Sequence, residues 1–222
     1  MPKFKPILDK AIKRMGGLEQ LEKELPKPKS TRQLKALPDD RYLSAMCLRI
    51  FRAGLKHTMV DAKWPAFEDA FFDFDPGRVA AMHEEALEEL MKNRRLIRHW
   101  PKMKAARANA AILVEISQDA GGFGAWLAAW PGTDITGLWA EFATRFNHMG
   151  GKSGPYFLRM VDKDTFVLSE GVVDVLVEKG VVSKKPTTKA DLAATQAVFN
   201  EWADESGRPL CHLSRICALS VG

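Results

Sequence analysis

Apolar residues recur along most of the chain at the three- and four-residue spacing that places them on one face of an α-helix. The spacing is clearest in two stretches, one with Leu43, Met46, Cys47, Ile50 and Leu55, the other with Leu192, Val198, Phe199 and Trp202. Only residues 165–168 (TFVL) have the composition of a strand, and four residues are too few to found a sheet. The pattern therefore predicts an all-α protein.

Polar residues and glycines mark where several of these helices begin and end. Asp39 is a candidate N-cap for a helix that runs to Leu55, and Asp75-Pro76 reads as a cap followed by a first-turn proline. Gly16-Gly17 ends the first helix, and Thr187 or Thr188 caps a later one. We expect helix boundaries at each of these positions.

Two stretches without apolar periodicity predict connections. Residues 25–40 (LPKPKSTRQLKALPDD) mix proline and lysine and predict an extended linker, and residues 182–188 (VSKKPTT) predict a second connection. We therefore expect an N-terminal helical hairpin with its linker over residues 1–37 and a main domain over residues 38–222.

Composition and charge narrow the class of protein only slightly. The 222 residues are 46% hydrophobic, enough for an ordinary core, and no uncharged run approaches the length of a membrane span. We expect a cytoplasmic monomer that does not contact a membrane. The net charge of +5 is compatible with a polyanionic partner, because neutralising phosphates releases counterions, but it does not require one.

The three cysteines are Cys47, Cys211 and Cys217, and no two of them form a CxxC pair. An odd number fits poorly with a secreted disulfide framework, so we expect reduced thiols. Cys211, His212 and Cys217 cluster near the end of the sequence, but a structural zinc ion normally needs four ligands. We expect neither a metal nor a cofactor.

The segment 148–160 (HMGGKSGPYFLRM) places a glycine-rich turn between two predicted helices. Such a turn can present backbone N–H groups and a helix N-terminus to a phosphate, with Lys152 and Ser153 adding a cation and a hydroxyl. The alternative is a helix C-cap followed by a tight corner that binds nothing. The spacing alone does not choose between the two.

This turn resembles the hairpin of the helix-hairpin-helix DNA glycosylases, and residues 164–169 resemble the segment leading to that superfamily's catalytic aspartate. Longer stretches, residues 47–82 and 96–113, are similar to collinear blocks of the type I DNA-3-methyladenine glycosylases. The matching positions are Ala53-Gly54-Leu55, Phe74-Asp75-Pro76, Val79-Ala80, Ile97-Arg98-His99, Lys102 and Asn109-Ala110. The resemblance covers residues 38–171 and implies an all-helical fold that flips a damaged nucleotide from duplex DNA and hydrolyses its N-glycosidic bond.

The chain departs from that family at four places. Arg49 stands where the family has a pocket glutamate, and His57 stands where it has a pocket tryptophan. No cysteine or histidine precedes Cys47, so the family's zinc ligands are incomplete, and Ser169 takes the place of the superfamily's aspartate, with Glu170 beside it. An arginine in the pocket disfavours a cationic base, because like charges repel.

The first hypothesis is therefore a divergent DNA glycosylase that excises an alkylated or otherwise damaged base from duplex DNA. In it Glu170 activates water, Arg49 and His57 contact the base, and the phosphate is bound by Gly150, Gly151, Lys152, Ser153 and Gly154. The alternative is a non-catalytic helix-hairpin-helix DNA-binding protein with a degenerate pocket, and a third is a helical interaction protein with an accidental likeness to the family. Six aromatic side chains could line a base pocket or belong to the core: Trp64, Phe67, Phe71, Phe72, Trp100 and Tyr156.

Overall fold

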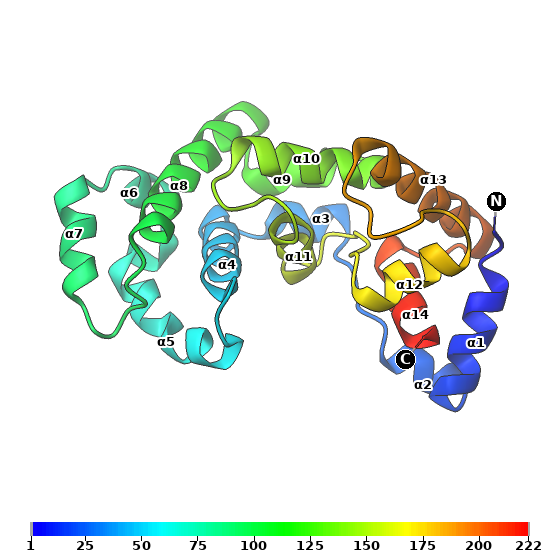
Figure 1. Ribbon diagram of the computed structural model, residues 1–222. Coiled ribbons are helices and arrows are strands. Elements are labelled where there is room, and N and C mark those ends of the chain that lie inside the picture. Colours follow the sequence, from blue (N-terminus) through cyan, green and yellow to red (C-terminus); the bar gives the residue numbers. More distant parts are fainter. Residues whose placement is uncertain (1, 222) are drawn as a thin grey trace. The chain divides into compact units, whose positions relative to one another are not determined.

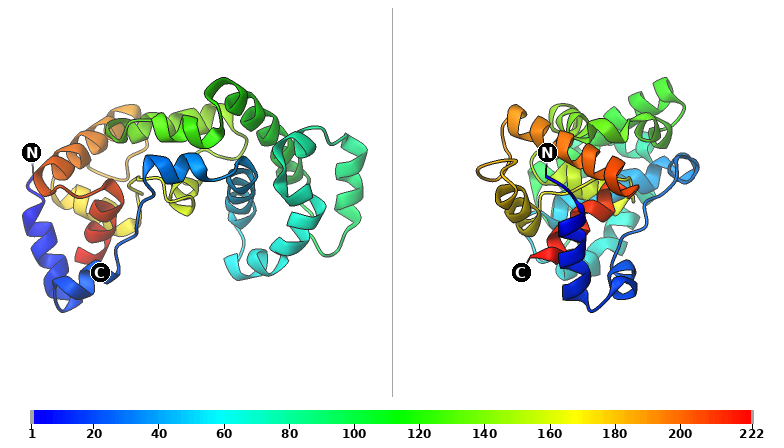
Figure 2. Two further views of the ribbon diagram at one scale, coloured as in Figure 1. Left: turned by 180° about the vertical axis from the view of Figure 1, so that it is seen from behind. Right: turned by 90° about the vertical axis from the view of Figure 1, so that its right-hand side faces the viewer.

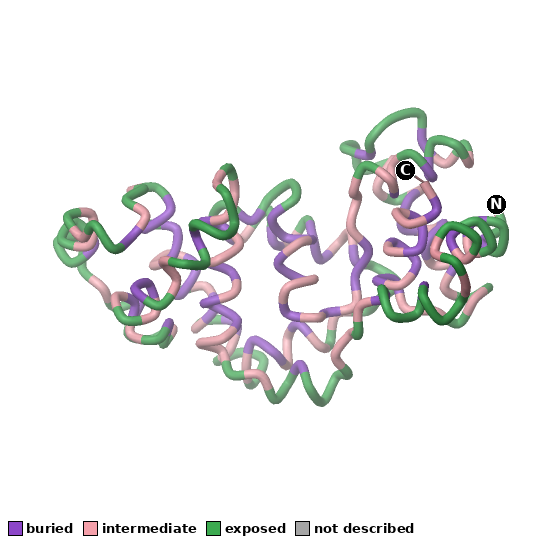
Figure 3. Tube along the Cα trace, turned by 90° about the horizontal axis from the view of Figure 1, so that it is seen from below, coloured by how far each residue is buried: buried purple, intermediate pink, exposed green. Residues whose placement is uncertain are grey.

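The computed structural model describes residues 2–221, and within them it contains helices and no strand (Figure 1). The all-α prediction is confirmed. Residues 165–168, the one strand-like stretch, form neither a helix nor a strand. Buried and exposed positions alternate along the helices, as expected for amphipathic helices that cover a core (Figure 3). None of the described helices is both long and apolar enough to cross a bilayer.

The helices fall into two compact units, each made of separate stretches of the chain. The first unit comprises Met1–Lys29, Trp130–Leu138 and Asp162–Gly222, and the second comprises Ser30–Ala129 and Trp139–Val161. The expected division of the chain after residue 37 is a different one, and it stays a prediction.

The first unit is built around α14 (Leu210–Ser220), which packs against α1 (Lys5–Met15) and α12 (Glu170–Glu178) (Figure 1, Figure 2). The carboxylate of Asp164 accepts the backbone amides of Leu210 and Cys211 at 3.0 and 2.8 Å, so a side chain from a distant loop caps α14. The unit also contains α2 (Leu18–Lys23), η2 (Gly132–Asp134) and α13 (Lys189–Ser206).

The second unit is centred on α4 (Asp39–Arg52) and α8 (Trp100–Ala120), which contact each other. Around them lie α3 (Thr31–Ala36), α5 (His57–Ala70), η1 (Phe72–Phe74), α6 (Pro76–Ala80), α7 (Glu84–Lys92), α9 (Phe123–Ala129) and α11 (Ser153–Met160). The helix before the glycine-rich turn, α10 (Ile135–Arg145), has residues in both units.

Most of the predicted helix boundaries are confirmed. Gly16 ends α1 in the left-handed conformation, with φ of 80°. The side chain of Asp75 caps α6 by accepting the amide of Arg78, and Thr188 caps α13.

Two predictions about the start of the second unit are wrong. Asp39 does not cap α4, which begins after Pro38 and ends at Arg52. Its carboxylate instead accepts the Ser117 hydroxyl and the amide of Phe123, far away in the sequence. Residues 31–36, expected to be extended, form α3. A capping box starts this helix: the Ser30 hydroxyl accepts the backbone N–H of Gln33, and the Gln33 side-chain oxygen accepts the backbone N–H of Ser30.

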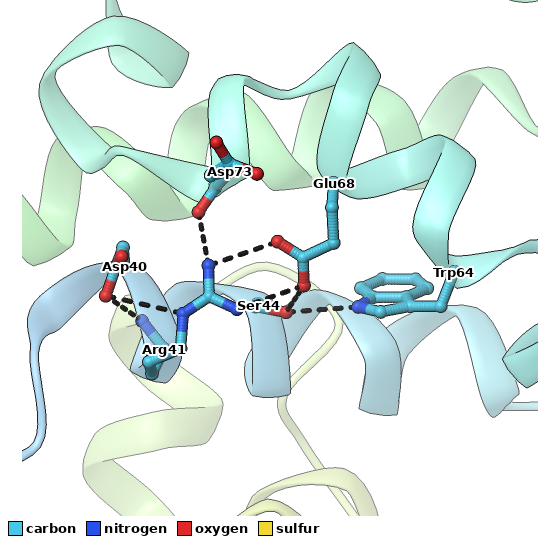
Figure 4. Close-up of polar contacts among 6 residues, drawn as sticks. All are labelled: Asp40, Arg41, Ser44, Trp64, Glu68 and Asp73. Carbon is cyan, nitrogen blue, oxygen red and sulfur yellow. Dashed lines mark hydrogen bonds and ion pairs between the residues drawn. The ribbon is translucent and has the colours of Figure 1, made fainter.

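A polar network joins α4, α5 and η1 (Figure 4). The two terminal nitrogens of Arg41 donate to the two carboxylate oxygens of Glu68 at 3.2 and 3.1 Å, and one of them also donates to the carbonyl of Asp73. Glu68 accepts the hydroxyl of Ser44 at 2.7 Å, and Ser44 in turn accepts the indole N–H of Trp64 at 3.0 Å.

The Asp73 carbonyl belongs to an unusual stretch of backbone. Phe72, Asp73 and Phe74 have φ angles of 55°, 54° and 59°, so three consecutive residues other than glycine are left-handed. Each costs roughly 1–2 kcal/mol relative to the right-handed form. Phe74 is buried and stacks against Trp64, and Phe72 lies under the guanidinium of Arg78 at 4.1 Å. These contacts and the Arg41 hydrogen bond hold the turn in place.

Candidate nucleic-acid interface and base site

The glycine-rich turn joins α10 to α11 in a tight, well-bonded hairpin. The amide of Gly154 donates to the carbonyl of Met149 at 2.9 Å, and the amide of Ser153 donates to the carbonyl of Gly150 at 3.1 Å. Gly151 is left-handed, with φ of 60°. Gly154 is needed for close packing, since a Cβ there would lie 3.0 Å from the Met149 carbonyl oxygen.

A buried amide side chain fixes the entrance to this turn. Asn109 is fully buried on α8, and its Oδ1 accepts the backbone N–H of Asn147 at 2.7 Å while its Nδ2 donates to the Asn147 carbonyl at 3.1 Å. Both polar backbone groups of one residue are thus held by a single rigid partner. The family resemblance includes Asn109 only as a matching position, but a polar residue on an apolar helix face is a signal that could have indicated this structural role.

The exposed part of the turn offers hydrogen-bond donors. Gly150, Gly151 and Lys152 are exposed, and their backbone amides have no acceptor among residues 2–221. They precede α11, whose N-terminus carries partial positive charge. Ser153 and Gly154 are buried, so they contribute more to the shape of the turn than to its surface. The turn is chemically suited to bind an anion such as a phosphate.

Arg49 lies on α4 with its guanidinium over the ring of Tyr156 on α11, 5.4 Å from the ring centroid. Its Nε atom is buried and donates to no acceptor in the described part of the chain. Burial lowers the pKa of Arg49, and the positive charge of Arg52 lowers it further, while Tyr156 opposes the shift. Arg49 is thus a half-buried cation that pairs with no carboxylate of residues 2–221.

A second cation lies near Arg49. Lys102 on α8 is buried, and its Nζ donates to the carbonyls of Phe51 and Ala53 at 3.3 and 2.7 Å, where α4 ends. Burial lowers the pKa of Lys102, and the charge of Arg49 adds to that shift. Lys102 therefore serves as a cap for α4 and contributes positive charge to the surroundings of Arg49.

The other two predicted site residues are exposed at helix starts. His57 is the first residue of α5, in the same unit as Arg49. Glu170 is the first residue of α12, where the side chain of Ser169 caps the helix, and it belongs to the other unit. Their assigned roles stay predictions.

The aromatic candidates divide clearly. Phe67 and Phe71 are fully buried and belong to the core. Trp64 is half-buried, stacks on Phe67 with ring centroids 5.0 Å apart and donates its indole N–H to Ser44, so it has a structural role at the edge of that core. Tyr156 is only partly buried and contacts the guanidinium of Arg49. It is the aromatic side chain best placed to face a ligand at Arg49.

The residues of the candidate zinc cluster are engaged in packing. Cys211 and Cys217 are buried, and His212 shares a hydrogen bond of 2.8 Å between its Nε2 and the carbonyl of Pro26. Across residues 2–221, no three side chains of His, Cys, Asp or Glu are grouped closely enough to hold a metal ion.

Comparison with known proteins places this arrangement in a class. The 8-oxoguanine DNA glycosylase of Methanocaldococcus jannaschii aligns with 95% of this chain and 89% of its own, with a TM-score of 0.55 at 14% identity. A 3-methyladenine DNA glycosylase I from Staphylococcus aureus aligns with 62% of this chain and 80% of its own, with a TM-score of 0.53 at 21% identity. The fold is that of the helical, helix-hairpin-helix DNA glycosylases, as predicted.

Sequence comparison then gives the family. The sequence model described as methyladenine glycosylase matches residues 34–145, just over half of the chain. The chain belongs to the methyladenine glycosylase family. DNA-3-methyladenine glycosylase 1 of Escherichia coli (strain K12) is 36% identical to it over 74 residues, 33% of this chain. The DNA-3-methyladenine glycosylase of Haemophilus influenzae is 37% identical over 65 residues, 29% of this chain. The matched stretches span only 40% of the length of the first relative and 35% of the second.

Proposed function

We propose that the protein is a DNA glycosylase that flips a damaged base out of duplex DNA and hydrolyses its N-glycosidic bond. The observation that carries the proposal is the family match over residues 34–145, which includes Arg49, His57 and Asn109. The anion-binding character of the hairpin turn supports the same proposal, because phosphate contacts position a protein on duplex DNA.

In this proposal the hairpin holds the DNA backbone, with the amides of residues 150–152 and the Lys152 ammonium on phosphate oxygens. Arg49, His57 and the ring of Tyr156 contact the flipped base. Water attacks C1′ of the sugar, the bond between C1′ and the base nitrogen breaks, and its electron pair leaves with the base. Glu170 takes the proton that the water releases.

Base release from duplex DNA tests this function. Duplexes carrying 3-methyladenine, 7-methylguanine or a neutral lesion are incubated with the wild-type protein, and the freed base and the abasic site are both quantified. Lys152→Ala should weaken duplex binding and reduce the salt dependence of the affinity by about one counterion. Lys92→Ala, which removes an exposed lysine paired with Glu89 on α7, is the matched control.

The outcomes separate the proposed enzyme from its alternative. Base release that weakens in Lys152→Ala and persists in Lys92→Ala supports a glycosylase bound through its hairpin. Salt-sensitive duplex binding without release of any base would overturn the enzymatic proposal and leave a non-catalytic DNA-binding protein.

A further inference from the structure

Among residues 2–221, Arg49 has a buried hydrogen-bond donor near the hairpin that bonds to no acceptor. Its Nε is buried with no acceptor in the described chain, although nearly all buried polar groups in proteins are hydrogen-bonded. Its guanidinium lies over Tyr156, the fourth residue of α11, so it sits close to the start of the helix that follows the hairpin turn. An unpaired, partly desolvated guanidinium favours a ligand that brings acceptor oxygens or nitrogens.

The charges around Arg49 are positive. Arg52 and Lys102 both interact with it electrostatically, and each interaction lowers a pKa, which is the signature of like charges. Arg52 is paired with the carboxylate of Asp61 at 2.8 and 2.7 Å, whereas Lys102 forms no ion pair within residues 2–221 and is the unbalanced charge beside Arg49. No ion pair joins Arg49 to a carboxylate within residues 2–221, so its guanidinium would repel a cation bound beside it.

We propose that Arg49 determines specificity by selecting a neutral damaged base with acceptor atoms on its edge, such as a 6-oxopurine, over a cationic alkylated base. This inference rests on the proposed glycosylase function and names its substrate class. A guanidinium can donate two parallel hydrogen bonds to the O6 and N7 acceptors of such a purine. The ring of Tyr156, which keeps the guanidinium in place, also offers a surface on which the base can stack.

The same charge assists the departure of a neutral base. When the bond between C1′ and the base nitrogen breaks, its electron pair goes to the base, which leaves as an anion with charge on its ring nitrogens and exocyclic oxygen. Water supplies the oxygen that joins C1′, and the proton that it releases goes to a proton-accepting side chain or to solvent. Arg49 would stabilise the developing anion, whereas a cationic base leaves neutral and gains nothing from it.

The test uses two purines that differ in charge, in one acceptor and by one methyl group. Hypoxanthine is neutral with O6 and N7 free. As a nucleotide linked through N9, 7-methylhypoxanthine has N7 blocked and is cationic in mildly acidic buffer, which keeps its N1 protonated and is used for both duplexes. Each is placed in the same duplex, once with ordinary deoxyribose for single-turnover release and once with a 2′-fluorinated sugar that resists cleavage for binding. The variants are Arg49→Gln, Arg49→Lys and Arg49→Glu, with Lys92→Ala as the control, and the melting temperature of each is checked.

The wild type should bind the neutral duplex more tightly than the cationic one, by about tenfold or more. Arg49→Gln should slow release of hypoxanthine by about tenfold to a hundredfold, with a smaller effect on binding of the unmodified duplex. Arg49→Lys should release hypoxanthine faster than Arg49→Gln but more slowly than the wild type, since lysine keeps the positive charge and cannot donate two parallel hydrogen bonds as a planar guanidinium can. Arg49→Glu should reverse the preference toward the cationic base.

Two results would overturn the inference while the proposed function stands: a wild type that releases the cationic base in preference, or an Arg49→Gln variant that slows both releases equally. Failure of the proposed function looks different. In that case no base is released, and the two uncleavable duplexes bind no better than unmodified DNA, which would end the inference as well.

Discussion

The network around Glu68 gives the sharpest test of how the second unit is held together (Figure 4). Glu68→Gln removes the negative charge while keeping the size of the side chain. It weakens both hydrogen bonds from Arg41 and the bond from the Ser44 hydroxyl, and it leaves the guanidinium without its counter-charge. Burial disfavours the Arg41 charge, but the hydrogen bond and charge of Glu68 prevail and raise the pKa of Arg41.

The expected loss of stability is about 2 kcal/mol. Hydrogen bonds to charged groups contribute about 1.5–3 kcal/mol when buried, and exposed ion pairs contribute about 0–1 kcal/mol. The Glu68 side chain is 21% exposed and the Arg41 side chain 40%, so the pair falls between these limits. Urea denaturation of Glu68→Gln, Arg41→Met and the double variant should give a coupling free energy of about 1 kcal/mol.

Glu141→Gln is the matched control, because Glu141 pairs with Arg145 one helical turn away on α10. Both side chains of this pair are 32% exposed, and Arg145 keeps Glu115 as a second partner at 3.2 Å, so loss of Glu141 should cost no more than about 0.5 kcal/mol. The reasoning is refuted if Glu68→Gln costs no more than Glu141→Gln, or if the Arg41 and Glu68 substitutions are additive.

Three further predictions follow from the backbone and from burial. Asp73→Gly relieves a left-handed residue and should stabilise the protein by about 1 kcal/mol, seen as a higher Tm; a lower Tm would contradict it. Gly154→Ala forces a Cβ toward the carbonyl of Met149 and should lower the Tm and weaken duplex binding together; unchanged binding would show that the turn's shape is irrelevant to DNA. Burial raises the pKa of the Cys47 and Cys217 thiols, so thiol reagents should label them only on unfolding; rapid labelling of the native protein would be inconsistent.

The fold was largely predictable because helical periodicity is a local property of the sequence. The two errors arose where local patterns compete with distant ones. Aspartate is a common N-cap residue, but the carboxylate of Asp39 accepts the backbone N–H of Phe123, 84 residues away, instead of capping its own helix. The prolines and lysines around α3 indicated an extended linker, so the helix was not predicted. The spacing of Ser30 and Gln33 is that of a capping box and could have indicated the start of a helix there.

The candidate site was predictable only in part. The spacing of glycines in the hairpin indicated the turn, and a resemblance to a family indicated Arg49 and His57. Sequence could not show that the Nε of Arg49 is a buried, unused donor or that Tyr156 lies beneath it, since these facts depend on how α4 and α11 pack. The functional roles given to Arg49, His57, Glu170 and residues 150–154 remain predictions.

Each unit is made of stretches that are separated in the sequence, and their order affects how the protein folds during synthesis on the ribosome. The apolar face of α1, with Ile7 and Ala11, packs against α14, whose residues are translated roughly two hundred positions later. All residues of the second unit have been synthesised once Val161 is added, so this unit can fold before α14 exists to cover α1. The apolar face of α1 is thus covered only after α14 has been synthesised, and until then it is open to capture by a holdase chaperone.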